Sequence, residues 1–199
     1  MSKEDDFVVK SLMKSIFVWL RTLFRGGFDE ERASFFLNGF DLRELSLDFI
    51  DVMLDNGADI NEIDHIGRNV FMHAAAGCTD ISILEYILNM GIDINQQDDT
   101  GMNALMLAAR YNESPSVVSF LVAKGANIKA TDIRKRTALI HAAIYSRTPE
   151  IIKVLLDSGA DGTATDNRRL TAFDHLKRSN NVRLMRSFAF ELLKESSGK

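Results

Sequence analysis

The chain has 199 residues, of which 46% are hydrophobic, and its 24 basic and 28 acidic side chains give a net charge of −4. This composition supports a packed core, and it argues against a dedicated nucleic-acid-binding protein because a basic excess is absent. The single cysteine, Cys78, excludes an intrachain disulfide and any metal site built on paired thiolates. Without a secretory signal or a run of about 20 apolar residues, we expect a cytoplasmic protein.

The N-terminal segment, residues 1–27, contains an amphipathic stripe that runs from Phe7 to Phe24. At helical spacing, one face carries Val9, Leu12, Met13, Ile16, Leu20 and Leu23. We expect this segment to form an extra capping helix that packs on the structure that follows. Two alternatives remain open: a surface for a partner or for self-association, and a helix that lies on a membrane surface through residues 7–24.

Residues 28–56 read as a degenerate first unit of a repeat. Its outer helix, from Ser46 to Asn56, keeps Phe49, Ile50, Met53 and Leu54 in helical phase. Phe40 and Asp41 stand where the later units have a pair of alanines.

A repeat of 34 residues follows. The interval separates Gly57, Gly91, Gly125 and Gly159, and an aspartate follows each glycine after seven residues, at Asp64, Asp98, Asp132 and Asp166. Because many positions keep the same interval, the periodicity predicts an array of stacked structural units. The aspartates are expected to shape turns.

Each unit predicts two helices. The first helix begins after Asn69, Asn103, Thr137 or Thr171, residues that can cap a helix, and all but the last of these helices contain an alanine pair. The second begins after a second expected cap, Asp80, Ser114 or Thr148, and Pro115 and Pro149 occupy the first helical position. The next glycine is expected to end the second helix. In the last unit Leu176 and Lys177 replace the alanine pair, and a closing helix from Val182 to Lys194 is expected to turn Leu184, Met185, Phe188 and Leu192 inward.

These units resemble the ankyrin repeat. The matching residues are Gly57-Ala58-Asp59-Ile60-Asn61, Asp64 and Gly67, together with Thr137-Ala138-Leu139 and Ala142-Ala143. The histidine that usually follows Thr-Pro-Leu in the family is replaced by Met72, Met106, Ile140 and Asp174, so we expect a usual cross-repeat hydrogen bond to be missing.

The resemblance implies an all-α, ankyrin-type helical solenoid with N- and C-terminal capping units and an extra N-terminal helix. The expected division is an extension at 1–27, a degenerate N-capping repeat at 28–56, ankyrin repeats at 57–90, 91–124 and 125–158, and a C-capping repeat at 159–199. Capping units are needed because a solenoid otherwise exposes an apolar face at each end.

The sequence offers no support for catalysis. His73, His141 and His175 share one register of the repeat, but adjacent rows are too far apart to share a metal ion, so we expect packed structural histidines. Cys78 has no neighbouring base that would make it a nucleophile. Phosphate-loop, zinc-protease and serine-hydrolase motifs are absent. We therefore expect no enzyme activity, no cofactor and no metal.

The remaining function is binding by a surface. In the resemblance, ligands meet the loop tips and the exposed side of the first helices, and Tyr111 and Tyr145 fall at one register there beside Arg110. Tyrosine and arginine are effective interface anchors. The expected binding residues are Tyr111, Tyr145, Arg110, Arg134, Arg136, Met102, Ile133, Arg68 and Arg168. The expected function is protein–protein interaction through a concave face, with a partner that carries an acidic or mixed acidic–apolar patch. The alternative is an adaptor tethered to a membrane surface by the N-terminal helix.

Overall fold

The computed structural model describes residues 66–179 and 181–198, and before them Leu47, Ile50, Asp51, Leu54, residues 59–61, 63 and 64. The expected N-terminal helix and most of the unit at 28–56 lie outside these described residues. Every regular element of the described part is a helix, and this part contains no strand. The all-α prediction is therefore confirmed.

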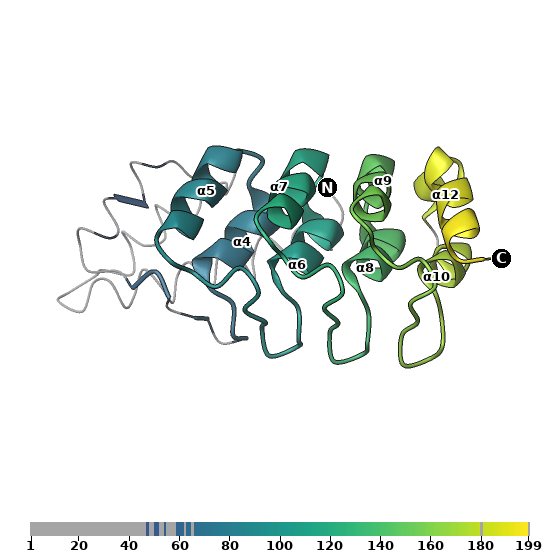
Figure 1. Ribbon diagram of the computed structural model, residues 1–199, viewed down its shortest axis with the longest axis horizontal. Coiled ribbons are helices and arrows are strands. Elements are labelled where there is room, and N and C mark those ends of the chain that lie inside the picture. The colour runs from purple at the N-terminus through teal and green to yellow at the C-terminus, as the bar shows by residue number, and fades with distance from the viewer. Residues whose placement is uncertain are drawn as a thin grey trace, which may run out of the picture.

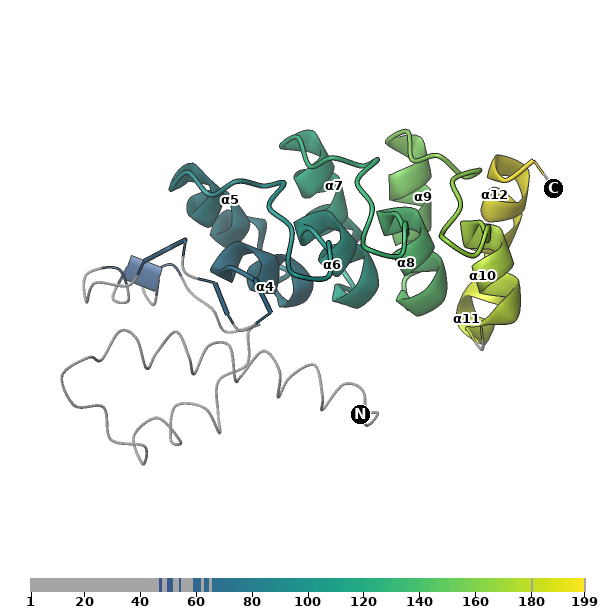
Figure 2. The ribbon, with the colours of Figure 1, turned by 90° about the horizontal axis from the view of Figure 1, so that it is seen from below.

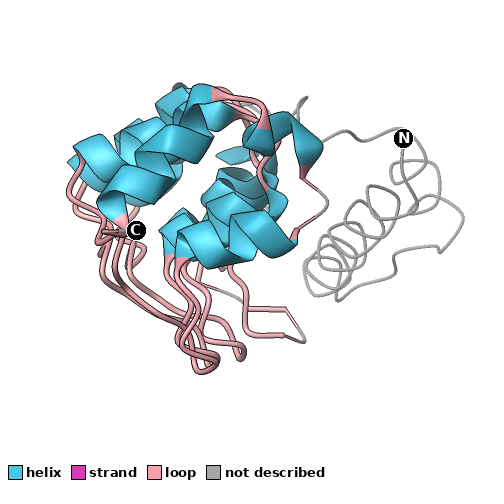
Figure 3. Ribbon diagram, turned by 90° about the vertical axis from the view of Figure 1, so that its right-hand side faces the viewer, coloured by secondary structure: helices cyan, strands magenta, loops and turns pink. Residues whose placement is uncertain are grey.

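The helices form two parallel rows (Figure 1). The inner row consists of α4 (Val70–Gly77), α6 (Ala104–Tyr111), α8 (Ala138–Tyr145) and α10 (Ala172–Arg178). The outer row consists of α5 (Ile81–Asn89), α7 (Pro115–Ala123), α9 (Pro149–Asp157) and α12 (Phe188–Ser196). Each inner helix packs against the next, and so does each outer helix. Viewed along the array, the loops between units superpose and project to one side (Figure 3).

Side-chain caps begin the inner helices as predicted. Asn69, Asn103 and Thr137 each accept a hydrogen bond from the backbone N–H three residues later, and Thr171 forms a complete capping box with Asp174. In the outer row, Asp80 accepts such a bond from the N–H of Ser82, and Ser187 accepts one from the N–H of Ala189. The prediction is wrong for Ser114 and Thr148, whose side chains make no capping bond to their helices.

The alanine pairs allow the inner helices to approach closely. Ala108 and Ala109 on α6 and Ala142 and Ala143 on α8 are completely buried. Larger side chains at these positions would force the helices apart, because a close-packed interior has no room for added methylenes. Larger side chains of the same core fill the space within and between units, among them Leu105, Leu107, Leu139, Val118, Leu121, Ile151 and Leu155.

Glycine ends each outer helix, as predicted. Gly91, Gly125 and Gly159 have φ angles of 92°, 95° and 89°, in the left-handed region that side chains disfavour. At the start of the described part, Ile50 is buried and Leu54 half-buried, in agreement with the predicted inward face of that helix.

The closing segment differs from the prediction. It forms two helices, the short α11 (Val182–Met185) and α12, because Ser187 caps a new helix by accepting a hydrogen bond from the N–H of Ala189 (Figure 2). The break changes the helical phase. Leu184 is buried as expected, but Met185 and Phe188 are exposed, and Ala189 and Leu193 pack inward instead.

Candidate interaction surface

The loop tips are built around the repeated aspartates. In each tip, one carboxylate oxygen of Asp64, Asp98, Asp132 or Asp166 accepts hydrogen bonds of 2.8–3.0 Å from the backbone N–H groups two and four residues later. This is the predicted turn role, and it fixes the shape of every tip.

Neighbouring tips are joined by backbone hydrogen bonds. The N–H of Asp99 donates to the carbonyl of Ile66 at 3.0 Å, that of Ile133 to Thr100 at 3.1 Å, and that of Asn167 to Arg134 at 2.9 Å. The four tips therefore form one continuous edge of fixed spacing along the array. A binding surface on this edge needs little ordering when a ligand docks.

The second carboxylate oxygen of each aspartate binds a side chain. In three units that side chain is a histidine, whose Nε2 lies 2.9 Å from Asp64 (His73), 3.1 Å from Asp132 (His141) and 2.9 Å from Asp166 (His175). Each histidine joins the start of an inner helix to the loop tip before it. The predicted structural role of these histidines is thereby confirmed.

In the unit that contains Asp98, the second carboxylate oxygen is bound by an arginine in place of a histidine. Leu107 occupies the histidine register there, and Asp98 is bound by Nε of Arg68 from the preceding unit at 2.8 Å. Sequence reasoning placed Arg68 on the binding surface and missed this bond. The absent histidine at residue 107 was the available signal, because it left the second oxygen of a buried carboxylate without a histidine donor from its own unit.

The environment of Asp132 holds its proton affinity low. Burial alone raises the pKa of this carboxyl, but hydrogen bonds from His141, from Arg136 and from the backbone of the tip outweigh burial, and the pKa lies well below its ordinary value. The pKa of His141 is also lowered, chiefly because burial penalises the imidazolium, although Asp132 opposes this effect. The pair is therefore a carboxylate beside a neutral imidazole at neutral pH.

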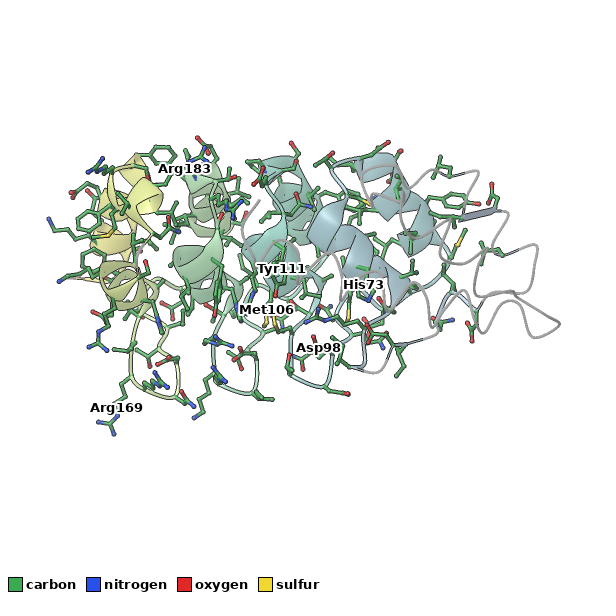
Figure 4. The ribbon with its side chains drawn as sticks, turned by 180° about the vertical axis from the view of Figure 1, so that it is seen from behind. His73, Asp98, Met106, Tyr111, Arg169 and Arg183 are labelled. Atoms are coloured by element: carbon green, nitrogen blue, oxygen red, sulfur yellow. The ribbon has the colours of Figure 1, made fainter. Side chains whose placement is uncertain are left out.

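An arginine lies between two tyrosine rings where inner helices α6 and α8 end. The guanidinium carbon of Arg110 is 3.8 Å from the ring centroid of Tyr145 and 4.9 Å from that of Tyr111. Tyr145 also stacks on His141, with centroids 6.2 Å apart and ring planes inclined by 22°. Figure 4 shows Tyr111 at the middle of the array. We call Arg110, Tyr111 and Tyr145 the aromatic–arginine cluster.

The cluster combines accessibility with an unsatisfied cation. Tyr145 is 40% exposed, whereas Arg110 and Tyr111 are half-buried. The Nε of Arg110 is buried without a hydrogen-bond partner, and within the described ranges no carboxylate forms an ion pair with this guanidinium. The sequence placed these three residues together, and the geometry brings them into contact.

Three other predicted binding residues are placed differently. Met102 is only 4% exposed, so the expectation that it adds apolar contact on the surface is wrong: its side chain belongs to the core. Arg68 and Arg136 are 16% and 12% exposed, and they bind Asp98 and Asp132 respectively. Both arginines therefore hold loop tips together, and neither presents an unengaged guanidinium to a partner.

The remaining predicted residues lie on the exposed tips. Ile133 is 70% exposed, and Arg134 and Arg168 are exposed beside it on the last two tips. In the part of the chain that the structure describes, no three histidine, cysteine or acidic side chains lie close enough to hold a metal ion. Over the same residues, no helix has both the length and the apolar character needed to cross a membrane.

Paired helices in two rows, joined by a continuous edge of loop tips, define a helical repeat protein. The family model of ankyrin repeats in three copies matches residues 43–132 and again residues 71–166. Because these matches cover more than half of the chain, the protein belongs to the ankyrin repeat family. Ankyrin repeats are generally protein–protein interaction modules and are typically not catalytic. A search of the curated proteins found no match.

Proposed function

We propose that this protein binds another protein through the face formed by the loop tips and the exposed side of the inner helices, without catalysis. The observation that carries the proposal is the aromatic–arginine cluster, in which Arg110 lies 3.8 Å from the ring centroid of a 40% exposed tyrosine. Tyrosine and arginine dominate the energetics of many interfaces.

The side chains of the aromatic–arginine cluster are already held in place before a partner binds. The contacts of Arg110 with the rings of Tyr111 and Tyr145 restrict its rotamers, and His141 supports the ring of Tyr145 from the adjacent position. A side chain that is already immobilised loses less conformational entropy when a partner docks. The edge of the guanidinium provides paired donors suited to a carboxylate.

The charge of this face favours an acidic or mixed acidic–apolar partner. Arg110 has no carboxylate partner among the described residues, and Arg134 and Arg168 are exposed on the tips. Ile133 supplies an exposed apolar side chain between them. Complementary charge accelerates the encounter with the correct partner and disfavours like-charged surfaces.

Crosslinking followed by a pull-down and mass spectrometry from the native cell will identify the partner, and substitution will test the surface. Tyr111→Ala combined with Tyr145→Ala should weaken the complex by several kcal/mol, because interface anchors are worth about 2 kcal/mol each. The third tyrosine gives a matched control: Tyr86→Phe on the outer helix α5 should leave capture unchanged. If the folded double variant captures the same partner at full strength, the cluster is not the anchor.

A further inference from the structure

Two basic residues occupy a tip position that favours glycine. The register that contains Gly67 and Gly101, with φ angles of 80° and 78°, continues at Lys135 and Arg169, both with φ of 60°. These are the non-glycine residues with positive φ in the described part of the chain. The left-handed conformation brings the Cβ atom against the following carbonyl, so a lysine or arginine is strained where glycine is not.

The strain is confined to these two residues, and a glycine at either position would relieve it. Glycine at residues 135 and 169 would adopt the same turn without strain, as it does in the two preceding tips. Strained backbone conformations persist where surrounding structure enforces them, and they cluster at binding and catalytic sites. The two positions therefore keep a charged side chain at the expense of folding stability.

Both strained residues add to a local concentration of positive charge. Arg134 precedes Lys135 on the third tip and Arg168 precedes Arg169 on the fourth, and all four side chains are exposed. The backbone bond from the N–H of Asn167 to the carbonyl of Arg134 holds the two tips together at 2.9 Å. We call Arg134, Lys135, Arg168 and Arg169 the tip cations.

None of the tip cations forms an ion pair within the described part of the chain. The buried carboxylates of the same two tips, Asp132 and Asp166, bind backbone N–H groups and histidines. Figure 4 shows the side chain of Arg169 projecting outward from the end of its loop. Like charges held close together repel, and an anion that binds them removes this repulsion.

We propose that the tip cations form an electrostatic docking site for an acidic segment of the partner protein, which lies across the third and fourth loop tips. This inference rests on the proposed function, because it assumes that the partner is a protein. An acidic peptide fits better than a nucleic acid or an anionic membrane for two reasons. The site spans only two tips, the preceding tip on the same edge carries the exposed Asp99, and the chain as a whole carries a net charge of −4. The exposed Ile133 beside the site suits an apolar side chain within the acidic segment.

Binding of a short, fluorescein-labelled poly-glutamate peptide, followed by fluorescence anisotropy at low ionic strength, tests the site. Lys135→Gly combined with Arg169→Gly should weaken peptide binding about tenfold, since each exposed pair contributes roughly two- to fivefold. The same variant should melt at a higher temperature than the parent chain, because glycine relieves the strain. Opposite effects on binding and on stability are not expected of residues with a purely structural role.

The control removes equal charge from elsewhere. Arg183→Gln combined with Arg186→Gln changes exposed residues on and beside α11, and Figure 4 places Arg183 on the side of the array opposite Arg169. This control should bind the peptide within about twofold of the parent chain. An equal loss in the control, or no loss in the glycine variant, overturns the proposal. Tighter binding of single-stranded DNA or of phosphatidylserine vesicles to the same cations overturns the choice of an acidic peptide.

The experiment separates this inference from the proposed function. Tyr111→Ala combined with Tyr145→Ala should bind poly-glutamate as the parent chain does, because the aromatic–arginine cluster lies at the opposite ends of the inner helices from the tips. If only the tyrosine variant loses the native partner, the result supports the aromatic–arginine cluster as the anchor and overturns the docking site at the tip cations. If only the glycine variant loses it, the reverse holds.

Discussion

Arg68 stabilises the array through a single buried carboxylate. The side chain of Asp98 is completely buried; one oxygen accepts bonds from Met102 and from Thr100, and the other is bound by Nε of Arg68 at 2.8 Å. Removing one partner of a buried ion pair typically costs about 3–5 kcal/mol. Because three hydrogen bonds to the first oxygen survive, we expect Arg68→Ala to lower the free energy of unfolding by about 3 kcal/mol.

The neighbouring units suggest how this loss can be repaired. Residue 107 is the register at which His141 donates to Asp132, and Asp132 accepts from Arg136 at the same time. Leu107→His should therefore place an imidazole Nε2 against Asp98. In the background of Arg68→Ala this substitution should restore about 1–2 kcal/mol relative to the sum of the single changes, which lies within the range of about 0.5–3 kcal/mol for coupled neighbours.

Urea denaturation at neutral pH, followed by far-ultraviolet circular dichroism, measures all four members of the cycle. Arg168→Ala is the matched control, since this exposed arginine has no ion pair in the described structure, and it should change stability by less than about 0.5 kcal/mol. A loss at Arg68 no larger than that of the control would refute the reasoning. Strict additivity of Arg68→Ala and Leu107→His would show that the histidine does not reach Asp98.

Three further predictions follow from the tips. Burial lowers the pKa of His141 from 6.5, so below about pH 6.5 the unfolded chain binds more protons than the folded chain, and the free energy of unfolding should fall as the pH decreases. In urea titrations between about pH 7 and pH 5, His141→Gln should make the free energy of unfolding depend less on pH. Below pH 3.8 a second loss is expected, because the depressed pKa of Asp132 stabilises the fold only while its carboxyl is ionised; Asp132→Asn should reduce this loss, and the remainder comes from other carboxyls with lowered pKa, such as Asp166. Gly101→Ala should cost about 2 kcal/mol or more in the same assay, since φ is 78° and the new Cβ would lie 2.9 Å from the backbone nitrogen of Ile133; an unchanged midpoint would contradict this.

The aspartate–histidine pairs show how much of the structure a repeat pattern can predict. The 34-residue interval put each aspartate nine residues before a histidine in three units, and it correctly indicated turns and packed rings. It did not indicate that the two side chains bind each other, because the contact depends on how the loop folds back on the helix. The bond between Arg68 and Asp98 was harder to foresee, since it crosses between units.

The binding residues divide in the same way. Tyr111 and Tyr145 were placed by register alone, but the position of Arg110 between their rings depends on rotamers that packing selects. Met102 was misplaced because its tip register holds polar, half-buried residues in two other units, Arg68 and Arg136, whereas its own side chain is apolar and packs in the core. Register specifies which residues are equivalent, and local packing decides which of them face solvent.

By itself, the sequence determined the paired helices of the repeats, the caps of the inner helices, the glycine stops and the stacking of similar units, because these depend on backbone preferences and on contacts repeated at a fixed interval. Only the tertiary structure decided which charged groups are engaged. Arg68 and Arg136 bind buried carboxylates, whereas Arg110 and the tip cations have no such partner in the described residues. The reason is physical: an ion pair depends on a few ångströms between side chains from different elements, and that distance is set by how those elements pack.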